Sequence, residues 1–181
     1  MGGVDLFYTG GVVKDAGTSA PDPLTNATFF VDGAEIGRVT EGVTLDLRIP
    51  GVENLPTAFG SVTSSQTGTL ELMFGDDYLN LTLQSATVTN IPLTETLNII
   101  FIASASELRS QQLPFGITIG EPISVSFSTH TTVPVSKSGN HITVFRSAGT
   151  GEITGVPEPA TMTLLAIGGV TMLKRRRRHR A

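Results

Sequence analysis

The sequence predicts an all-β fold: an antiparallel β-sandwich or jelly-roll-like body with a short C-terminal hydrophobic helix. Short apolar segments with period-two alternation recur along the first 150 residues, and turn residues separate them. The charged fraction is only 15%, and 25 threonines and 14 serines carry much of the polar surface, as is common in β-structure. One domain of about 150 residues is large enough to bury a core.

The first predicted hairpin turns at Asp32-Gly33, a dipeptide that favours a tight turn. Its apolar residues are Phe29, Phe30, Val31, Ile36 and Val39.

Residues 43–49 form the next predicted strand, because apolar and polar side chains alternate strictly there. A second hairpin follows, with Gly75-Asp76-Asp77 as a three-residue turn. Its two apolar faces are Leu70, Leu72 and Phe74 on one strand, and Leu79, Leu81 and Leu83 on the other.

Residues 97–103 are apolar on both faces, which predicts a central strand. Residues 105–112, which precede Pro114, are the one helical prediction within the body. Two further strands are predicted, one carrying Ile123, Val125 and Phe127, and one carrying Ile142 and Val144 after a Ser138-Gly139-Asn140 turn.

The charge distribution divides the chain into an acidic body and a basic tail. Residues 1–159 contain six basic and sixteen acidic residues, hence a net charge of −10, whereas residues 174–181 carry +6. An acidic body has no electrostatic reason to bind nucleic acid or an anionic membrane surface. The tail can do either, so its neighbours in the sequence decide its interpretation.

Three segments succeed one another at the C-terminus. Pro157-Glu158-Pro159 predicts an exposed, extended spacer. Residues 160–173 are uncharged, and as a helix they would span roughly 21 Å, less than a hydrocarbon core of about 30 Å. The residues predicted to lie in the membrane include Ala160, Leu164, Leu165, Ile167, Val170 and Leu173. The cations predicted to stay on the cytoplasmic side are Lys174, Arg175, Arg176, Arg177, Arg178 and Arg180.

This order of segments resembles the PEP-CTERM sorting signal of Gram-negative and related bacteria. The resemblance implies that an exosortase, a membrane-embedded transpeptidase-like enzyme, recognises Pro157, Glu158 and Pro159 and removes the rest of the tail. The expected organisation is a body at 1–150, a linker at 151–159, a membrane segment at 160–173 and a basic tail at 174–181. The resemblance covers about the last 26 residues and leaves the body unassigned.

Alternatives remain for the single segments. A fourteen-residue apolar run is more often part of a core, and a basic cluster alone resembles a nuclear localisation or nucleic-acid-binding patch. Export also requires a leader, yet the first eleven residues, MGGVDLFYTGG, have neither a basic nor a long apolar region. We therefore expect a leader that is missing from this start or was removed.

No catalytic residue is predicted in the body. The chain has no cysteine and no GxSxG motif, and His130 and His141 are expected at the surface. Asp76, Asp77 and Asn80 are weak candidates for a Ca²⁺ contact, and no other cofactor or metal is expected.

Three classes of function fit the sequence. The first is an exported, non-catalytic cell-surface or extracellular-matrix protein, and the alternative is a secreted hydrolase that acts on polysaccharide. The third is a cytoplasmic protein with a nucleic-acid-binding tail. We favour the first, with an exosortase and transiently the inner membrane as partners and no nucleic acid. Extracellular polysaccharide and biofilm association are implied only by the resemblance.

Overall fold

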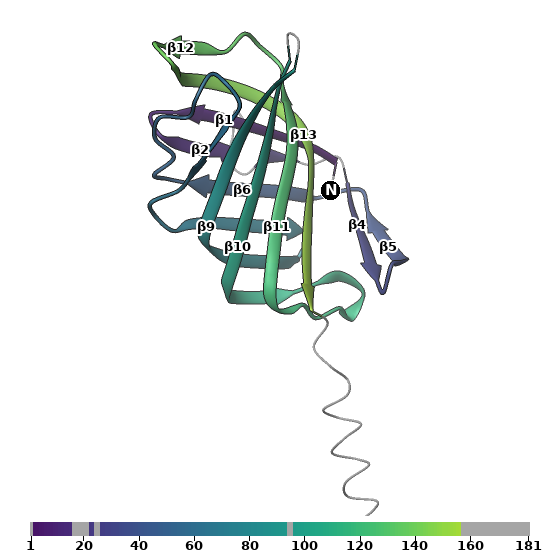
Figure 1. The fold of residues 1–181 in the computed structure, drawn as a ribbon. Coiled ribbons are helices and arrows are strands. Elements are labelled where there is room, and N and C mark those ends of the chain that lie inside the picture. Colours follow the sequence, from purple (N-terminus) through teal and green to yellow (C-terminus); the bar gives the residue numbers. More distant parts are fainter. Residues whose placement is uncertain (1, 16–21, 24–25, 94–95, 157–181) are drawn as a thin grey trace, which may run out of the picture.

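The computed structural model describes residues 2–15, 22–23, 26–93 and 96–156, and nearly all of them form antiparallel β-structure (Figure 1). The strands are β1 Gly2–Thr9, β2 Val12–Asp15, β3 Asp22–Pro23, β4 Ala27–Val31, β5 Ala34–Val39, β6 Val43–Ile49, β7 Gly60–Thr63, β8 Gly68–Phe74, β9 Asp77–Leu93, β10 Thr96–Gln112, β11 Gly120–Thr131, β12 Ser136–Ser138 and β13 His141–Val156. A single 3₁₀ turn, η1, covers Pro114–Gly116 within these ranges. The all-β prediction is confirmed.

One sheet forms most of the body, and it closes on itself. Its strands are ordered β1-β2-β6-β8-β9-β10-β11-β13, and β13 pairs again with β1. In Figure 1, β1, β2 and β6 cross β9, β10 and β11 steeply, so the two halves of the sheet face each other as two layers. The layers of the predicted sandwich are therefore parts of one continuous sheet, and the bent strands β9 and β13 take part in both.

Alternating side chains build the core between the layers. In β6, Val43, Leu45, Leu47 and Ile49 are at most 2% exposed, as their period-two spacing predicted. The predicted apolar faces of β8 and β11 are buried as well. Residues 97–103 lie in β10, which is paired on both sides and is thus a central strand.

The predicted helix at 105–112 is wrong, because these residues continue β10. They pair with the first half of β9, from Ala105↔Leu83 to Gln112↔Tyr78. The register shifts between Ala105 and Glu107 and again between Leu108 and Ser110, and such shifts break the alternation by which a strand is recognised in sequence. Pairing with a neighbouring strand outweighs the modest helix propensity of this segment.

Two boundaries also differ from those predicted. The turn between β8 and β9 has two residues, Gly75 and Asp76, because Asp77 already pairs with Phe74. The expected linker at 151–159 begins too early, since β13 continues to Val156 and Gly151 pairs with Phe127 of β11. Its glycines give this segment the composition of a linker, but at Gly155 the missing side chain allows close packing against Ile119 and Gly120.

Candidate functional site

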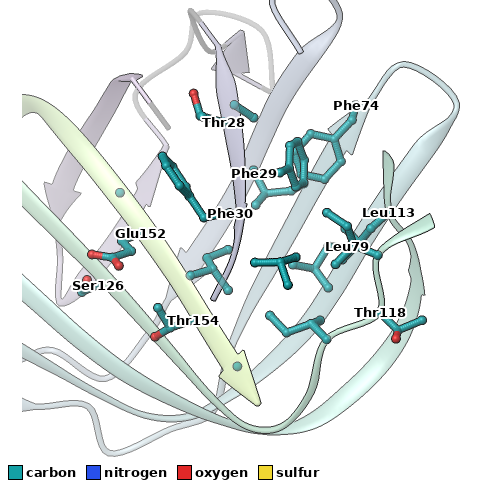
Figure 2. Close-up of a pocket in the computed structure, with 18 of the residues that line it drawn as sticks. Thr28, Phe29, Phe30, Phe74, Leu79, Leu113, Thr118, Ser126, Glu152 and Thr154 are labelled. Carbon is teal, nitrogen blue, oxygen red and sulfur yellow. The ribbon is translucent and has the colours of Figure 1, made fainter. Parts of the chain in front are cut away.

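A groove of about 810 Å³ lies between the β4–β5 hairpin, the loop after β10 and the C-terminal half of β13. The apolar wall consists of Ala27, Phe29, Leu72, Phe74, Leu79, Leu113, Ile117 and Ile119, and the polar wall of Ser126, Ser128, Thr150, Glu152 and Thr154. Figure 2 shows Phe29 near Phe74 on one side of β4 and Phe30 on the other side, toward Glu152. The described lining residues include two carboxylates, Asp32 and Glu152, and no basic residue.

Aromatic packing at the middle of β4 fixes the β4–β5 hairpin against β8 and η1. Asp32 and Gly33 have φ angles of 51° and 79°, as a two-residue hairpin turn requires, which confirms the predicted turn. The ring of Phe29 contacts Phe74 and Phe115 edge to face, with centroid separations of 5.2 and 5.6 Å. Gly37 leaves room for the ring of Phe115, because a Cβ at that position would collide with it.

The two body histidines lie apart on the surface. His130 is exposed in β11 and pairs with Ala148, whereas exposed His141 begins β13. Seven residues along β13 separate them, about 23 Å at strand spacing. His141 Nδ1 lies 3.2 Å from the carbonyl oxygen of Asn54. This geometry does not bring the two imidazoles to one site.

The weak calcium candidates have separate surroundings. Asp77 Oδ1 accepts a hydrogen bond from Gln112 Nε2 at 3.1 Å, and Asn80 Nδ2 donates to Ser110 Oγ at 3.2 Å. Asp76 is exposed in the turn. In the ranges that the structure describes, no three His, Asp or Glu side chains form a group that could hold a metal ion.

Two groups with shifted pKa values lie on β1 and β2. Burial raises the pKa of Asp15, whose Oδ1 accepts a hydrogen bond from the Leu47 amide at 3.3 Å. Burial, and to a smaller extent the charge of Glu53, raises the pKa of Tyr8, whose hydroxyl donates to the Val52 carbonyl at 2.8 Å. Each has its partner on a neighbouring segment of backbone, so both act in the packing of the sheet.

Cations cross the outer face of the sheet in a row that no sequence pattern predicted. Arg146 pairs with Phe7, Phe7 with Lys14, and Lys14 with Arg48, so the four side chains succeed one another across β13, β1, β2 and β6. The Arg146 guanidinium lies 5.3 Å and the Lys14 ammonium 5.8 Å from the centre of the Phe7 ring. We call these four residues the cationic row. No sequence signal connects them, because strand pairing alone brings them together.

The cationic row concentrates positive charge on a body whose net charge is negative. It holds three of the six basic residues in 1–159, and the structure gives none of the three an ion pair with a described carboxylate. Lys14 and Arg48 are direct cross-strand neighbours, an arrangement of like charges that destabilises a sheet. Asp5 and Asp46 border the row on one side, two residues before Phe7 and Arg48. The row is therefore a narrow cationic strip on an acidic body.

The three predicted parts of the tail, from Pro157 through Arg180, lie outside the described residues. Within the part of the chain that the structure describes, no helix has the length and apolarity needed to cross a membrane. The described residues thus define an all-β body whose last strand leads directly into the tail.

Comparison with known proteins identifies the tail. Residues 155–178 match the family model of the PEP-CTERM protein-sorting motif, so the chain carries this sorting signal. The signal implies export, transient anchoring in the membrane and processing by an exosortase. The match reaches only the last two residues of β13 and leaves the rest of the body unassigned. Comparison with curated proteins and with solved structures found no match.

Proposed function

We propose that the protein is a non-catalytic component of the cell surface or extracellular matrix, released from the membrane when its tail is removed. The observation that carries the proposal is the sorting motif at residues 155–178. The motif overlaps only the last two residues of a body that is closed by its own hydrogen bonds, since β13 reaches Val156 within the sheet. Cleavage beyond that residue leaves every described strand intact.

In this proposal each part of the tail has one role. The exosortase recognises Pro157, Glu158 and Pro159, the segment 160–173 lies in the inner membrane, and the cations of 174–180 stay on the cytoplasmic side. Arginine side chains snorkel toward the interface and lengthen the effective span of the short apolar segment. Two prolines favour an extended conformation of the spacer, which would give the enzyme access to it beside the folded body.

Replacement of Pro157-Glu158-Pro159 by three alanines tests the sorting role in cells that contain the exosortase. The variant is expected to accumulate at full length in the membrane fraction, while the wild type appears in the medium as a shortened form. Intact-mass analysis of both fractions measures the outcome. Pro134→Ala, which changes an exposed proline of the body, is the matched control and keeps normal processing. Equal processing of the triple variant and the wild type would contradict the proposal.

An acidic polysaccharide is the matrix partner that we propose for the body. The cationic row supports it, because three cations and an aromatic ring extend over three strand spacings, about 14 Å, and match the anionic groups and apolar faces of such a chain. Lys14→Gln and Arg48→Gln are each expected to weaken binding of polygalacturonate by about two- to fivefold, or roughly 0.4–1 kcal/mol. Added salt should weaken wild-type binding as well.

Arg38→Gln is the control for this measurement, because Arg38 lies on the β4–β5 hairpin and its Nη2 is 3.8 Å from Glu35 Oε1. It removes the same charge from the body but not from the row. Calorimetric titration at two salt concentrations measures all three variants. Equal losses for Arg38→Gln and the row variants would reduce the effect to net charge and contradict the site.

The hydrolase remains the second candidate, since the groove contains the carboxylates of Asp32 and Glu152. It predicts turnover of a polysaccharide that Glu152→Gln abolishes. The non-catalytic proposal predicts no turnover by either form.

A further inference from the structure

Exposed apolar side chains gather at the end of the body where the tail begins. Among the side chains that the structure describes, five large apolar ones are exposed: Phe30 at 59%, Ile36 at 42%, Phe59 at 72%, Phe115 at 55% and Val133 at 45%. Phe30 and Ile36 belong to the β4–β5 hairpin, and Phe115 lies in η1, whose loop leads into the pairing of Gly120 with Val156. Three of the five thus lie at the end of the body that contains the last residue of β13.

One contact joins the two segments that carry these three residues, η1 and the β4–β5 hairpin. Phe115 packs against the Phe29 ring and over Gly37, so η1 and the hairpin touch. Phe115 has a φ of 62°, which is uncommon for a bulky residue and is maintained by this packing. The groove described above continues between the hairpin and Gly155. We call Phe30, Ile36 and Phe115 the apolar end.

The other two exposed apolar residues mark the opposite end of β13. The Thr57 amide donates to the Asn140 carbonyl at 2.9 Å, which places the loop of Phe59 beside the start of that strand. The Thr132 amide donates to the Arg146 carbonyl at 2.9 Å, so Val133 also lies near the first half of β13. Phe59 is therefore a natural control for Phe30 and Phe115.

The length of the spacer limits how far the apolar end can be from the bilayer. Four residues lead from Val156 to Ala160, the first residue of the predicted membrane segment. Fully extended, they span at most about 14 Å. An anchored chain therefore has its apolar end next to the membrane and its opposite end, with Phe59, far from it.

From this placement we infer that the apolar end inserts into the outer surface of the membrane while the tail is anchored, with Phe30, Ile36 and Phe115 in the headgroup and acyl boundary. The inference rests on the anchoring role proposed for the tail. A lipid surface fits because the exposed side chains are aromatic and aliphatic, and side chains of this kind partition into the interface. Asp32 and Glu152 beside them favour zwitterionic over anionic lipid.

Anchoring makes such a contact effective although it is small. The spacer confines the apolar end near the bilayer at a high effective concentration, so a weak intrinsic affinity is sufficient. When the tail is removed, the apolar end is no longer held at a high effective concentration near the bilayer. The body then leaves the membrane. The contact orients the spacer for the processing enzyme without retaining the product.

The chain contains no tryptophan, so single substitutions provide clean fluorescence reporters. Phe30→Trp, Phe115→Trp and the control Phe59→Trp are compared in the full chain bound to phosphatidylcholine vesicles, with and without brominated acyl chains. Ile36→Trp serves as a second reporter on the hairpin, and circular dichroism verifies that each variant folds. Emission of the reporters at positions 30, 36 and 115 is expected to shift to the blue and to be quenched by bromine, whereas position 59 is expected to do neither.

Co-flotation with the vesicles tests the anchoring role of the tail separately from the membrane contact of the apolar end. A chain that floats, but whose reporters at 30, 36 and 115 behave like the reporter at 59, overturns only the contact of the apolar end. A chain that does not float overturns the anchoring role and this inference with it. The chain shortened to Val156 is expected to lose most of the quenching, and full quenching without the tail would contradict the dependence on anchoring.

Discussion

Asp15 illustrates the cost of burying a single carboxylate. It is 6% exposed at the end of β2, and its principal described compensation is the hydrogen bond from the Leu47 amide. Loss of water around the charge raises its pKa, and nearby Asp46 raises it further, whereas the hydrogen bond lowers it. The folded state therefore retains the proton of Asp15 to a higher pH than the unfolded state, whose value is near 3.8.

The sign of the pH dependence is set by this difference. The stability that protonated Asp15 contributes is fully present below pH 3.8 and is lost as the pH rises through the higher pKa of the folded state. Asp15→Asn retains an oxygen acceptor for Leu47 and removes the buried charge. It is expected to raise the melting temperature at pH 7 by roughly 2–4 °C, the shift for about 1 kcal/mol in a chain of this size, with no gain at pH 3.5.

Thermal unfolding at the two pH values measures this prediction. Asp5→Asn, which neutralises an exposed carboxylate on the neighbouring strand, is the control and is expected to change little at either pH. An equal shift for Asp15→Asn at both pH values would show that a factor other than ionisation is responsible.

At the scale of the element, β13 shows why glycine is needed inside a strand. It pairs with β1 along its first half and with β11 along its second half. Gly149 lies where the two pairings meet, and a Cβ there would collide with the backbone oxygen of Ser128. The close approach of β11 and β13 at this point therefore requires a residue without a side chain.

Gly149→Ala is expected to lower the free energy of unfolding by about 1–3 kcal/mol, because the backbone of β11 has to move. Thr150→Ala, at the next and exposed position, is the control and is expected to stay within about 0.5 kcal/mol of the wild type. Urea unfolding measures both variants. A neutral Gly149→Ala would show that the strands separate at low cost.

At the scale of the whole molecule, the sheet is complete without the tail. The ring of strands closes through the pairing of β1 with β13, and among the residues that the structure describes the buried cluster extends from Val4 to Phe145. A chain that ends at Val156 is expected to unfold at the same urea concentration as the full chain in the same detergent. A lower midpoint would show that residues beyond 156 pack on the body.

The regular strands were predictable because each buries one face. Val43–Ile49 and the apolar residues of β8 and β11 show this alternation, and the structure confirms them. Residues 105–112 were predicted wrongly, since bulges interrupt the alternation and the stabilising partner, β9, is distant in sequence. The predicted start of the linker is wrong for a related reason. The glycines near the end of β13 allow the neighbouring backbone to approach closely, and no local sequence pattern reveals that approach.

The sorting signal was determined by the sequence alone. Its recognition depends on the order of a spacer, an apolar run and a block of cations within a short segment, and the motif match at 155–178 agrees with it. The cationic row and the apolar end were decided only by the tertiary structure. Lys14, Arg48 and Arg146 meet because strand pairing joins distant residues, and Phe29 meets Phe115 because a hairpin packs on a loop. A sorting signal consists of residues that are adjacent in the sequence, so the sequence reveals it. A surface such as the cationic row depends on contacts that folding forms between residues distant in the sequence.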